Sequence, residues 1–179
     1  MKAPEAPIST PPLAYIDIIL PLINAARGML EGGQSLQSFV FVGNLTTKQT
    51  MAVMVETGSE ETKDQAAENI RLAAMALDAD FTFAIMEAWS LPPEKMSQMN
   101  AIFDKYGSIG ASPFAVDTCS FMLETRHGSW MAQPVIKKMG VSKKKRTFGK
   151  VEFRFYTELQ GRFAHFLPIK DDEVPGVLH

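Results

Sequence analysis

The apolar run from Phe81 to Met86 constrains the fold of this chain most strongly. It lies within DFTFAIMEAW and directly follows SEETKDQAAENIRLAAMALDA, residues 59 to 79. A short apolar run bounded by polar residues is typical of a strand that is covered on both faces. We therefore predict a central strand here, with structure packed on both sides of it.

The segment 59 to 79 has the pattern of an amphipathic helix. Ser59 is suited to the N-cap, and Glu60 and Glu61 complement the positive end of the helix dipole. One stripe of small and apolar residues repeats at helical spacing: Ala66, Ile70, Ala73, Ala74 and Leu77. Because strand, helix and strand follow in order, we expect residues 50 to 57 and 81 to 89 to be parallel neighbours joined by a right-handed crossover.

The other segments complete an α+β domain. Helical spacing predicts a helix over residues 13 to 31, kinked at Pro21 and ended by Gly32 and Gly33. Two β-runs at 39 to 57 predict an antiparallel hairpin, and PPEKMSQMNAIFDKY predicts a short helix over residues 92 to 106. Four strand-like runs follow: SPFAVDTCSFMLET, WMAQPVIKK, VEFRFYTEL and RFAHFLP.

We thus expect a single α+β domain over residues 13 to 179, preceded by an extended Pro-rich arm over residues 1 to 12. Its sheet is mixed, mostly antiparallel, with about six or seven strands and two or three helices. Polar residues interrupt the apolar segment 13 to 31, which argues against a signal peptide or a membrane span. The single cysteine, Cys119, lies in an apolar run and is expected to be buried, which suggests a reducing compartment, the cytoplasm.

The stretch KKMGVSKKKRTFGK, residues 137 to 150, concentrates the positive charge. It holds seven Lys or Arg and no acid, whereas the rest of the chain has eleven Lys or Arg against twenty Asp or Glu. We expect it to project as a mobile loop or the tip of a β-ribbon. Three interpretations stay open: a solvated tip, a nucleic-acid contact, or a contact with an acidic protein surface. The candidate binding residues are Lys137, Lys138, Lys143, Lys144, Lys145, Arg146, Phe148 as a stacking surface, and Lys150.

Carboxylates at strand ends offer an alternative site. Glu87 and Glu124 each follow an apolar β-run, and such a pair can divide acid and base roles or hold a divalent cation if the two converge. A hydrolase or metal-dependent enzyme is therefore the alternative function. Glu87, beside Trp89, is expected to need a charged partner because the central strand leaves it little solvent.

We find no metal-ligand spacing, nucleophile elbow or phosphate-binding glycine loop in the sequence. The sequence therefore favours a non-enzymatic binding or accessory protein, with no catalytic residue, metal or cofactor expected. We expect a homodimer, since two-fold dimers are the commonest oligomers. Two interfaces are candidates: the last hairpin (Phe153, Phe155, Tyr156, Phe163, Phe166) and the helical face of Met96, Met99 and Phe103.

The layout of residues 50 to 136 resembles that of small uncharacterised proteins carried by phages and mobile elements. The features that carry the resemblance are Glu87-Ala88-Trp89 at a strand end, a Pro-containing segment, and a strand that ends in Glu124 before the turn at Gly128. The resemblance implies an α+β fold and no particular activity.

Overall fold

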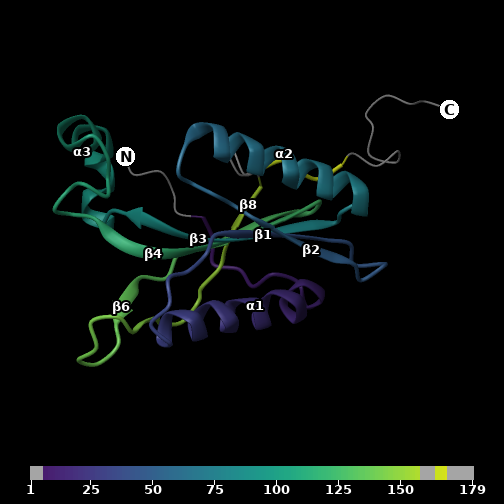
Figure 1. The fold of residues 1–179 in the computed structure, drawn as a ribbon, viewed down its shortest axis with the longest axis horizontal. Helices are drawn as coiled ribbons and strands as arrows, with labels where there is room; N and C mark the ends of the chain where they lie inside the picture. The colour runs from purple at the N-terminus through teal and green to yellow at the C-terminus, as the bar shows by residue number, and fades with distance from the viewer. Residues whose placement is uncertain (1–5, 158–163, 169–179) are drawn as a thin grey trace.

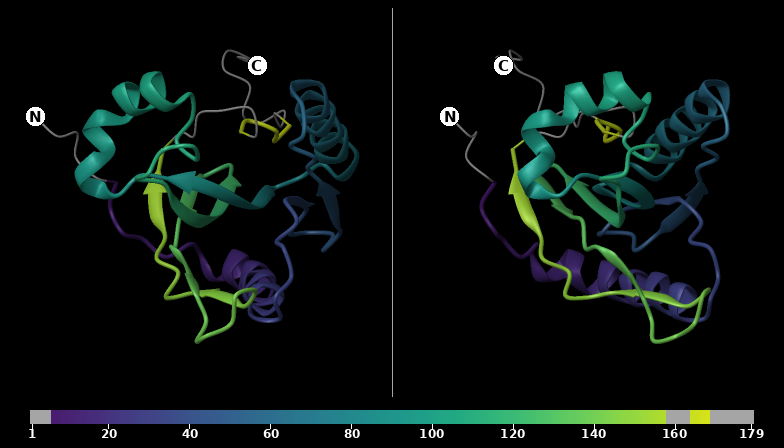
Figure 2. Two further views of the ribbon diagram at one scale, coloured as in Figure 1. Left: turned by 60° about the vertical axis from the view of Figure 1, so that its left-hand side comes forward. Right: turned by 90° about the vertical axis from the view of Figure 1, so that its left-hand side faces the viewer.

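The computed structural model describes residues 6 to 157 and 164 to 168, which form an α+β domain with a sheet between two helices (Figure 1). Helix α1 lies on one face of the sheet and α2 on the other. Figure 2 shows the same layers from two further sides, with a small hairpin alongside α1. The α+β fold predicted from the sequence is confirmed.

The main sheet has six strands among the described residues, in the order β2-β1-β3-β4-β5-β8, and all neighbouring pairs are antiparallel. Its strands are β1 (Phe39–Gly43), β2 (Thr50–Met54), β3 (Phe81–Ser90), β4 (Val116–Thr125), β5 (Gly128–Ala132) and β8 (Arg154–Tyr156). Strand β3 is central, as predicted.

The prediction that β2 and β3 are parallel neighbours is wrong. The two strands do run in the same direction, but β1 lies between them and is antiparallel to both. The reason is burial: β1 carries Val40 and Val42, which are fully buried, whereas most of β2 is exposed. The more apolar strand of the hairpin therefore occupies the inner position.

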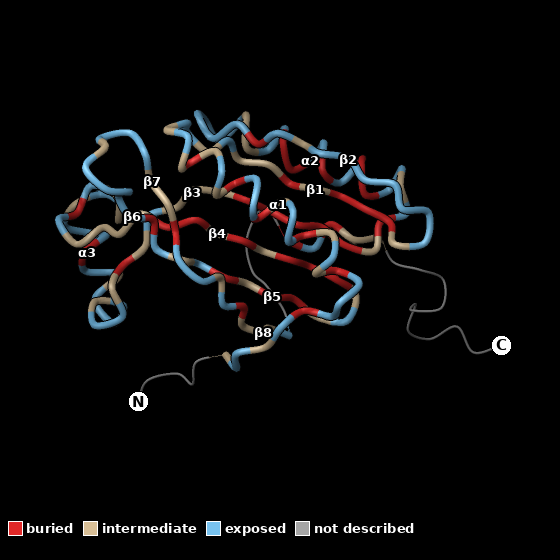
Figure 3. The backbone as a smooth tube through the Cα atoms, turned by 90° about the horizontal axis from the view of Figure 1, so that it is seen from below, coloured by how far each residue is buried: buried red, intermediate tan, exposed pale blue. Residues whose placement is uncertain are grey.

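The side chains of β3 alternate between two cores. Phe81, Phe83 and Ile85 pack in the core beneath α1, and Ala84 packs in the core beneath α2. Figure 3 shows this burial along β3 and β4, which run through the middle of the molecule. Any residue of these strands can thus be assigned to the α1 face or the α2 face by its position.

Helix α1 (Leu13–Glu31) ends at Gly32 as predicted. By length and composition it is the one described helix that can cross a membrane. In the structure it covers the sheet, with five of its residues buried in the core: Tyr15, Ile19, Ile23, Ala26 and Leu30. Its apolar stripe is therefore used in packing.

Helix α2 (Glu60–Leu77) confirms the predicted cap and stripe. The Ser59 hydroxyl accepts a hydrogen bond from the Thr62 amide at 3.1 Å, and the Thr62 side chain accepts one from the Ser59 amide. These bonds satisfy amides at the helix start. Ile70 and the alanines of the stripe are buried against β1 and β3.

The predicted helix over residues 92 to 106 forms two pieces, a 3-10 helix η1 (Pro93–Gln98) and α3 (Met99–Tyr106). Ile102 is the buried residue of α3, whereas Met96 and Phe103 are exposed. The predicted methionine face assumed 3.6 residues per turn throughout. A 3-10 helix has three per turn, so the regular spacing of Met96, Met99 and Phe103 does not hold across the two pieces.

The outer edge of β8 is covered by the start of the chain. Residues 6 to 9 are extended beside it: the Ser9 amide donates to the Phe153 carbonyl and the Phe155 amide to the Pro7 carbonyl, both at 3.0 Å. The described part of the N-terminal arm therefore docks on its own chain.

The prediction of a strand over residues 162 to 168 is wrong for 164 to 168, which are not in a strand; Phe163 lies outside the described residues. Phe153 and Phe166 are buried in the two cores, and the ring of Phe155 contacts that of Trp130 with centroids 5.1 Å apart. These rings pack within the protein's own core. The predicted dimer interface at the last hairpin rested on their being available to a partner, and it loses that support.

Candidate functional site

The basic stretch forms an ordered hairpin. Strand β6 (Ile136–Lys138) pairs antiparallel with β7 (Arg146–Phe148), and the Met139 amide donates to the Lys145 carbonyl at 2.9 Å. In the connecting turn, the Ser142 hydroxyl accepts from the amides of Lys144 and Lys145 at 3.3 and 3.1 Å. The ribbon interpretation is thus confirmed. We call residues 136 to 150 the lysine hairpin.

Arg146 points toward the main sheet and forms two ion pairs. Its guanidinium lies 2.8 Å from Glu87 Oε1 and 2.9 Å from Asp117 Oδ2, and all three side chains are about three-quarters buried. Glu87 and Trp89 flank Ala88 on β3, and Asp117 sits opposite Trp89 on β4. Glu87 has the charged partner that the sequence predicted. Arg146 itself, predicted to bind a ligand, is engaged inside the protein.

Phe148 also points inward, so the prediction of an exposed stacking surface is wrong. It is 1% exposed, and its ring meets that of Phe121 edge to face with centroids 5.5 Å apart. The guanidinium of Arg27 also lies over the ring, 4.2 Å from its centroid, and donates to the carbonyls of Phe148 and Gly149. Burial of Phe148 in the core and its contact with the Arg27 cation together hold strand β7 in place.

The hairpin is also fixed along the C-terminal end of α1. The Thr147 hydroxyl donates to Glu31 Oε1 at 2.8 Å. Gly33, with φ of +81°, lies next to the turn: a Cβ there would be 3.5 Å from the Cβ of Lys144, an ordinary van der Waals distance. Strand β7 is therefore attached to α1, and the turn lies beside Gly33.

The remaining cations of the hairpin face solvent. They are Lys137, Lys138, Lys143, Lys144, Lys145 and Lys150. None of these six forms an ion pair with a residue in the described part of the chain. Since Arg146 is neutralised by Glu87 and Asp117, the lysines carry the outward positive charge.

The structure does not bring Glu87 and Glu124 together. Glu87 pairs with Cys119, whose side chain is in the α1 core, whereas Glu124 pairs with Thr82 on the α2 face. The two positions are five residues apart along β4, roughly 17 Å at the rise of an extended strand. Carboxylates on opposite faces at that spacing cannot act on one substrate. Trp89, half exposed, packs its indole over Gly110.

Glu124 instead holds the segment that follows the sheet. Glu124 is 8% exposed, and its carboxylate accepts from the His165 amide at 3.0 and 2.9 Å. Burial raises the pKa of this carboxyl above its ordinary value, and the hydrogen bond from His165 opposes the shift. A small cavity of about 270 Å³ opens beside it, lined also by Thr125, Arg126 and Ser129.

No described group of three His, Cys, Asp or Glu side chains can hold a metal ion. Cys119 is fully buried, as predicted, and burial with the nearby charges of Glu87 and Asp117 raises the pKa of its thiol to about 12. The thiol is therefore protonated and a poor nucleophile at neutral pH.

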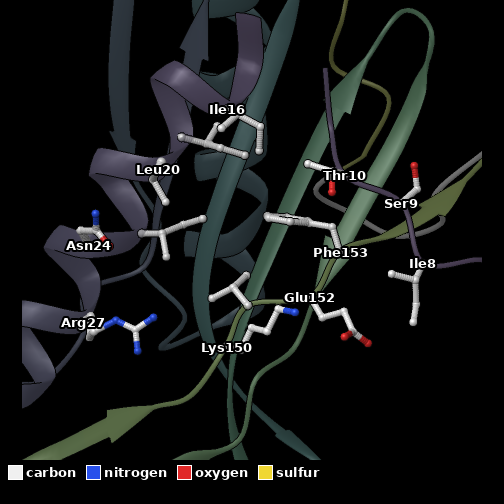
Figure 4. A pocket seen from close by; sticks show the side chains of 13 residues that line it. Ile8, Ser9, Thr10, Ile16, Leu20, Asn24, Arg27, Lys150, Glu152 and Phe153 are labelled. Atoms are coloured by element: carbon white, nitrogen blue, oxygen red, sulfur yellow. The ribbon is translucent and has the colours of Figure 1, made fainter. Parts of the chain in front are cut away.

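A groove of about 390 Å³ lies beside the lysine hairpin (Figure 4). Ile16 and Leu20 of α1 line one wall and Phe153 the other, while Arg27, Lys150 and Glu152 also line it. The guanidinium of Arg27 already donates to two carbonyls, and the acidic Glu152 also lines the groove. The groove therefore has less positive charge available to bind an anion than the exposed lysines of the hairpin have.

Reasoning from the sequence missed Arg27, Glu31 and Asp117 as anchors of the hairpin. A signal was present: Arg146 is the single arginine in a run of lysines, and arginine is the residue that suits a planar, two-carboxylate partner.

No protein-family model matches the chain, and no curated protein or solved structure is significantly similar to it. The resemblance to small phage and mobile-element proteins stays a prediction.

Proposed function

We propose that this chain is a non-enzymatic binding protein that presents its lysine hairpin to the phosphate backbone of a nucleic acid. The observation that carries the proposal is the division of the hairpin's charge. Arg146 is consumed in anchoring, and six lysines are left outward without a described acidic partner.

The anchoring favours a ligand over a merely solvated tip. A tip that only keeps a sheet edge soluble needs charge and no fixed position. Here Arg146 is tied to two strands of the main sheet, Phe148 is in the core, and Thr147 is bound to α1. Because the backbone that carries the lysines is held in place, it loses less conformational entropy on binding than a mobile loop does, and this improves affinity for an extended anion.

Lysine contacts and the absence of an exposed aromatic residue in the lysine hairpin favour binding without sequence preference. Lysine is a flexible point charge suited to phosphate oxygens, and phosphate contacts carry no direct sequence information. We expect duplex DNA and RNA to bind with similar affinity. We also propose that the protein is cytoplasmic, because its single cysteine is buried and a protein of a reducing compartment needs no disulfide.

The enzyme alternative is weaker because Glu87 and Glu124 lie on opposite faces of the sheet. Glu87 is also neutralised by Arg146.

Fluorescence anisotropy with labelled duplex DNA and RNA tests the proposal. The variant Lys143→Ser, Lys144→Ser, Lys145→Ser should weaken binding by about tenfold or more at low salt. A matched control, Lys63→Ser, Lys95→Ser, Lys105→Ser, changes the net charge equally and should bind like wild type. Equal loss in both variants would assign binding to net charge alone. No binding by the wild-type protein at low salt would leave the hairpin as a solvated tip, and retention only by an acidic protein would assign it to that partner.

A further inference from the structure

The outer edge of β2 is the open edge of the main sheet. Strand β2 ends the strand order, and no described residue pairs with its outer side. Thr50 to Met54 carry no charge and no proline, and Met51 and Met54 are 46% and 49% exposed. Natural proteins usually protect such edges with lysine, proline or a covering segment, because unpaired strands recruit other strands.

The backbone groups of this edge are arranged for a further ladder. The Asn44 amide donates to the Gln49 carbonyl at 3.0 Å and the Val55 amide to the Ser38 carbonyl at 2.9 Å, so odd-numbered residues face β1. Antiparallel hydrogen bonds recur at every second residue. The amides and carbonyls of Thr50, Ala52 and Met54 therefore point outward.

We propose that this edge pairs antiparallel with the β2 edge of a second copy of the chain, about a two-fold axis at Ala52. In this register Ala52 faces its own counterpart, and Thr50 of each copy faces Met54 of the other. Each of the three pairs joins two outward-facing residues, so all the outward groups of the strand are used. The two-fold axis also keeps the α2 faces of both sheets on the same side.

The charges that flank β2 fit the same register. Lys48 precedes the strand and Glu56 follows it, each four residues from Ala52, and both are exposed. Lys48 has a left-handed backbone (φ 60°) and lies beyond the extended ladder, as Glu56 does at the other end. In the antiparallel arrangement Lys48 of each copy lies at the same end of the ladder as Glu56 of the other, twice per dimer. This match favours self-pairing. A segment with a base before the strand and an acid after it is complementary in charge to an antiparallel copy of itself.

The opposite edge explains why the assembly closes. Residues 6 to 9 cover β8, so a second sheet cannot add there, and pairing through β2 ends at two copies. On the η1 and α3 side, Lys95 and Lys105 lie over Phe114 and Tyr106 of the same chain.

Sedimentation equilibrium of the full chain tests the proposal. Wild type should give twice the 19.8 kDa mass of the chain at micromolar concentration. Ala52→Pro removes an outward amide and leaves the bonds to β1, so it should weaken the dimer at least about tenfold. The control Ala52→Thr keeps the amide and should dimerise normally. A wild-type monomer, or a dimer unaffected by Ala52→Pro, would overturn the proposal.

Charge reversal gives a test that does not depend on proline. Lys48→Glu and Glu56→Lys should each weaken the dimer by placing like charges at the same end of the ladder, and the double variant should restore it. Ala52→Cys should form a disulfide-linked dimer on oxidation, because directly opposed residues in such a pair lie about 5.5 Å apart. Asn100→Cys on α3 should not. A crosslink through Asn100→Cys alone, or no rescue by the double reversal, would assign the dimer to another surface.

Discussion

Arg146 and Glu87 are separated by 59 residues in the sequence, and their side chains meet at 2.8 Å between Nη2 and Oε1. This ion pair, with the 2.9 Å contact to Asp117, joins the lysine hairpin to the paired strands β3 and β4. Removing it leaves two partly buried carboxylates without their cation, which costs more than the pair contributes when intact.

Arg146→Met should therefore lower the free energy of unfolding by about 1 to 3 kcal/mol. Urea denaturation followed by circular dichroism measures the change. Adding Glu87→Gln and Asp117→Asn to Arg146→Met should recover part of the loss, because the orphaned charges are then gone. A loss below about 0.5 kcal/mol in the single variant would show that the cluster does not anchor the hairpin.

Phe148→Ala should destabilise the protein more strongly, by about 3 to 5 kcal/mol, because the ring fills the core between Phe121 and Arg27. The matched control is Val141→Ala in the turn of the same hairpin, where the side chain is fully exposed. It should change the free energy of unfolding by less than about 0.5 kcal/mol. Similar effects from both substitutions would contradict the inward placement of Phe148.

The Cys119 thiol should resist modification in the folded protein. It is fully buried, and its pKa is raised to about 12, so little reactive thiolate exists at neutral pH. A colorimetric disulfide reagent should react slowly in buffer and rapidly in urea, with one thiol per chain. Fast reaction in buffer would place Cys119 at the surface.

Glu124 should make stability depend on pH in a defined direction. Its pKa is raised in the folded state, so its contribution is present below the ordinary value of 4.5 and is lost as pH rises through the folded pKa. Glu124→Gln cannot ionise and keeps an acceptor for the His165 amide. The variant should therefore gain stability over wild type as pH increases toward neutral.

The comparison of wild type with Glu124→Gln in urea, at a pH near 4.5 and at neutral pH, measures this difference. Glu152→Gln, an exposed carboxylate, controls for the loss of one charge. An advantage for Glu124→Gln that is largest in acid would reverse the expected sign.

The features that the sequence predicted correctly depend on neighbours along the chain. The cap at Ser59, the α2 stripe and the central position of Phe81 to Met86 follow from local periodicity and burial. By contrast, the contacts of Phe148 with Arg27 span 121 residues, and the Arg146 cluster depends on the register of β3 with β4. Nothing local distinguishes the inward arginine from the six outward lysines of the hairpin.

The position of β2 was missed for a related reason. The order of strand, helix and strand predicted direction correctly, but the choice between adjacent and separated strands depends on which member of the hairpin is more apolar. Comparing FVFVG with TMAVM indicates that the first is the inner strand. The methionines and Thr50 of the second tolerate an exposed edge better than a run of phenylalanine and valine does.

The salt dependence of nucleic-acid binding tests the central claim most directly. Each phosphate neutralised on duplex DNA contributes about −0.9 to the slope of log K against log salt concentration. We predict a wild-type slope of about −3.6 to −5.4, from about four to six contacts, and a slope shallower by about 2 to 3 for the Lys143, Lys144, Lys145 triple serine variant. Binding whose slope is the same in both proteins, or no binding at low salt, would contradict the claim that the anchored lysines contact phosphates.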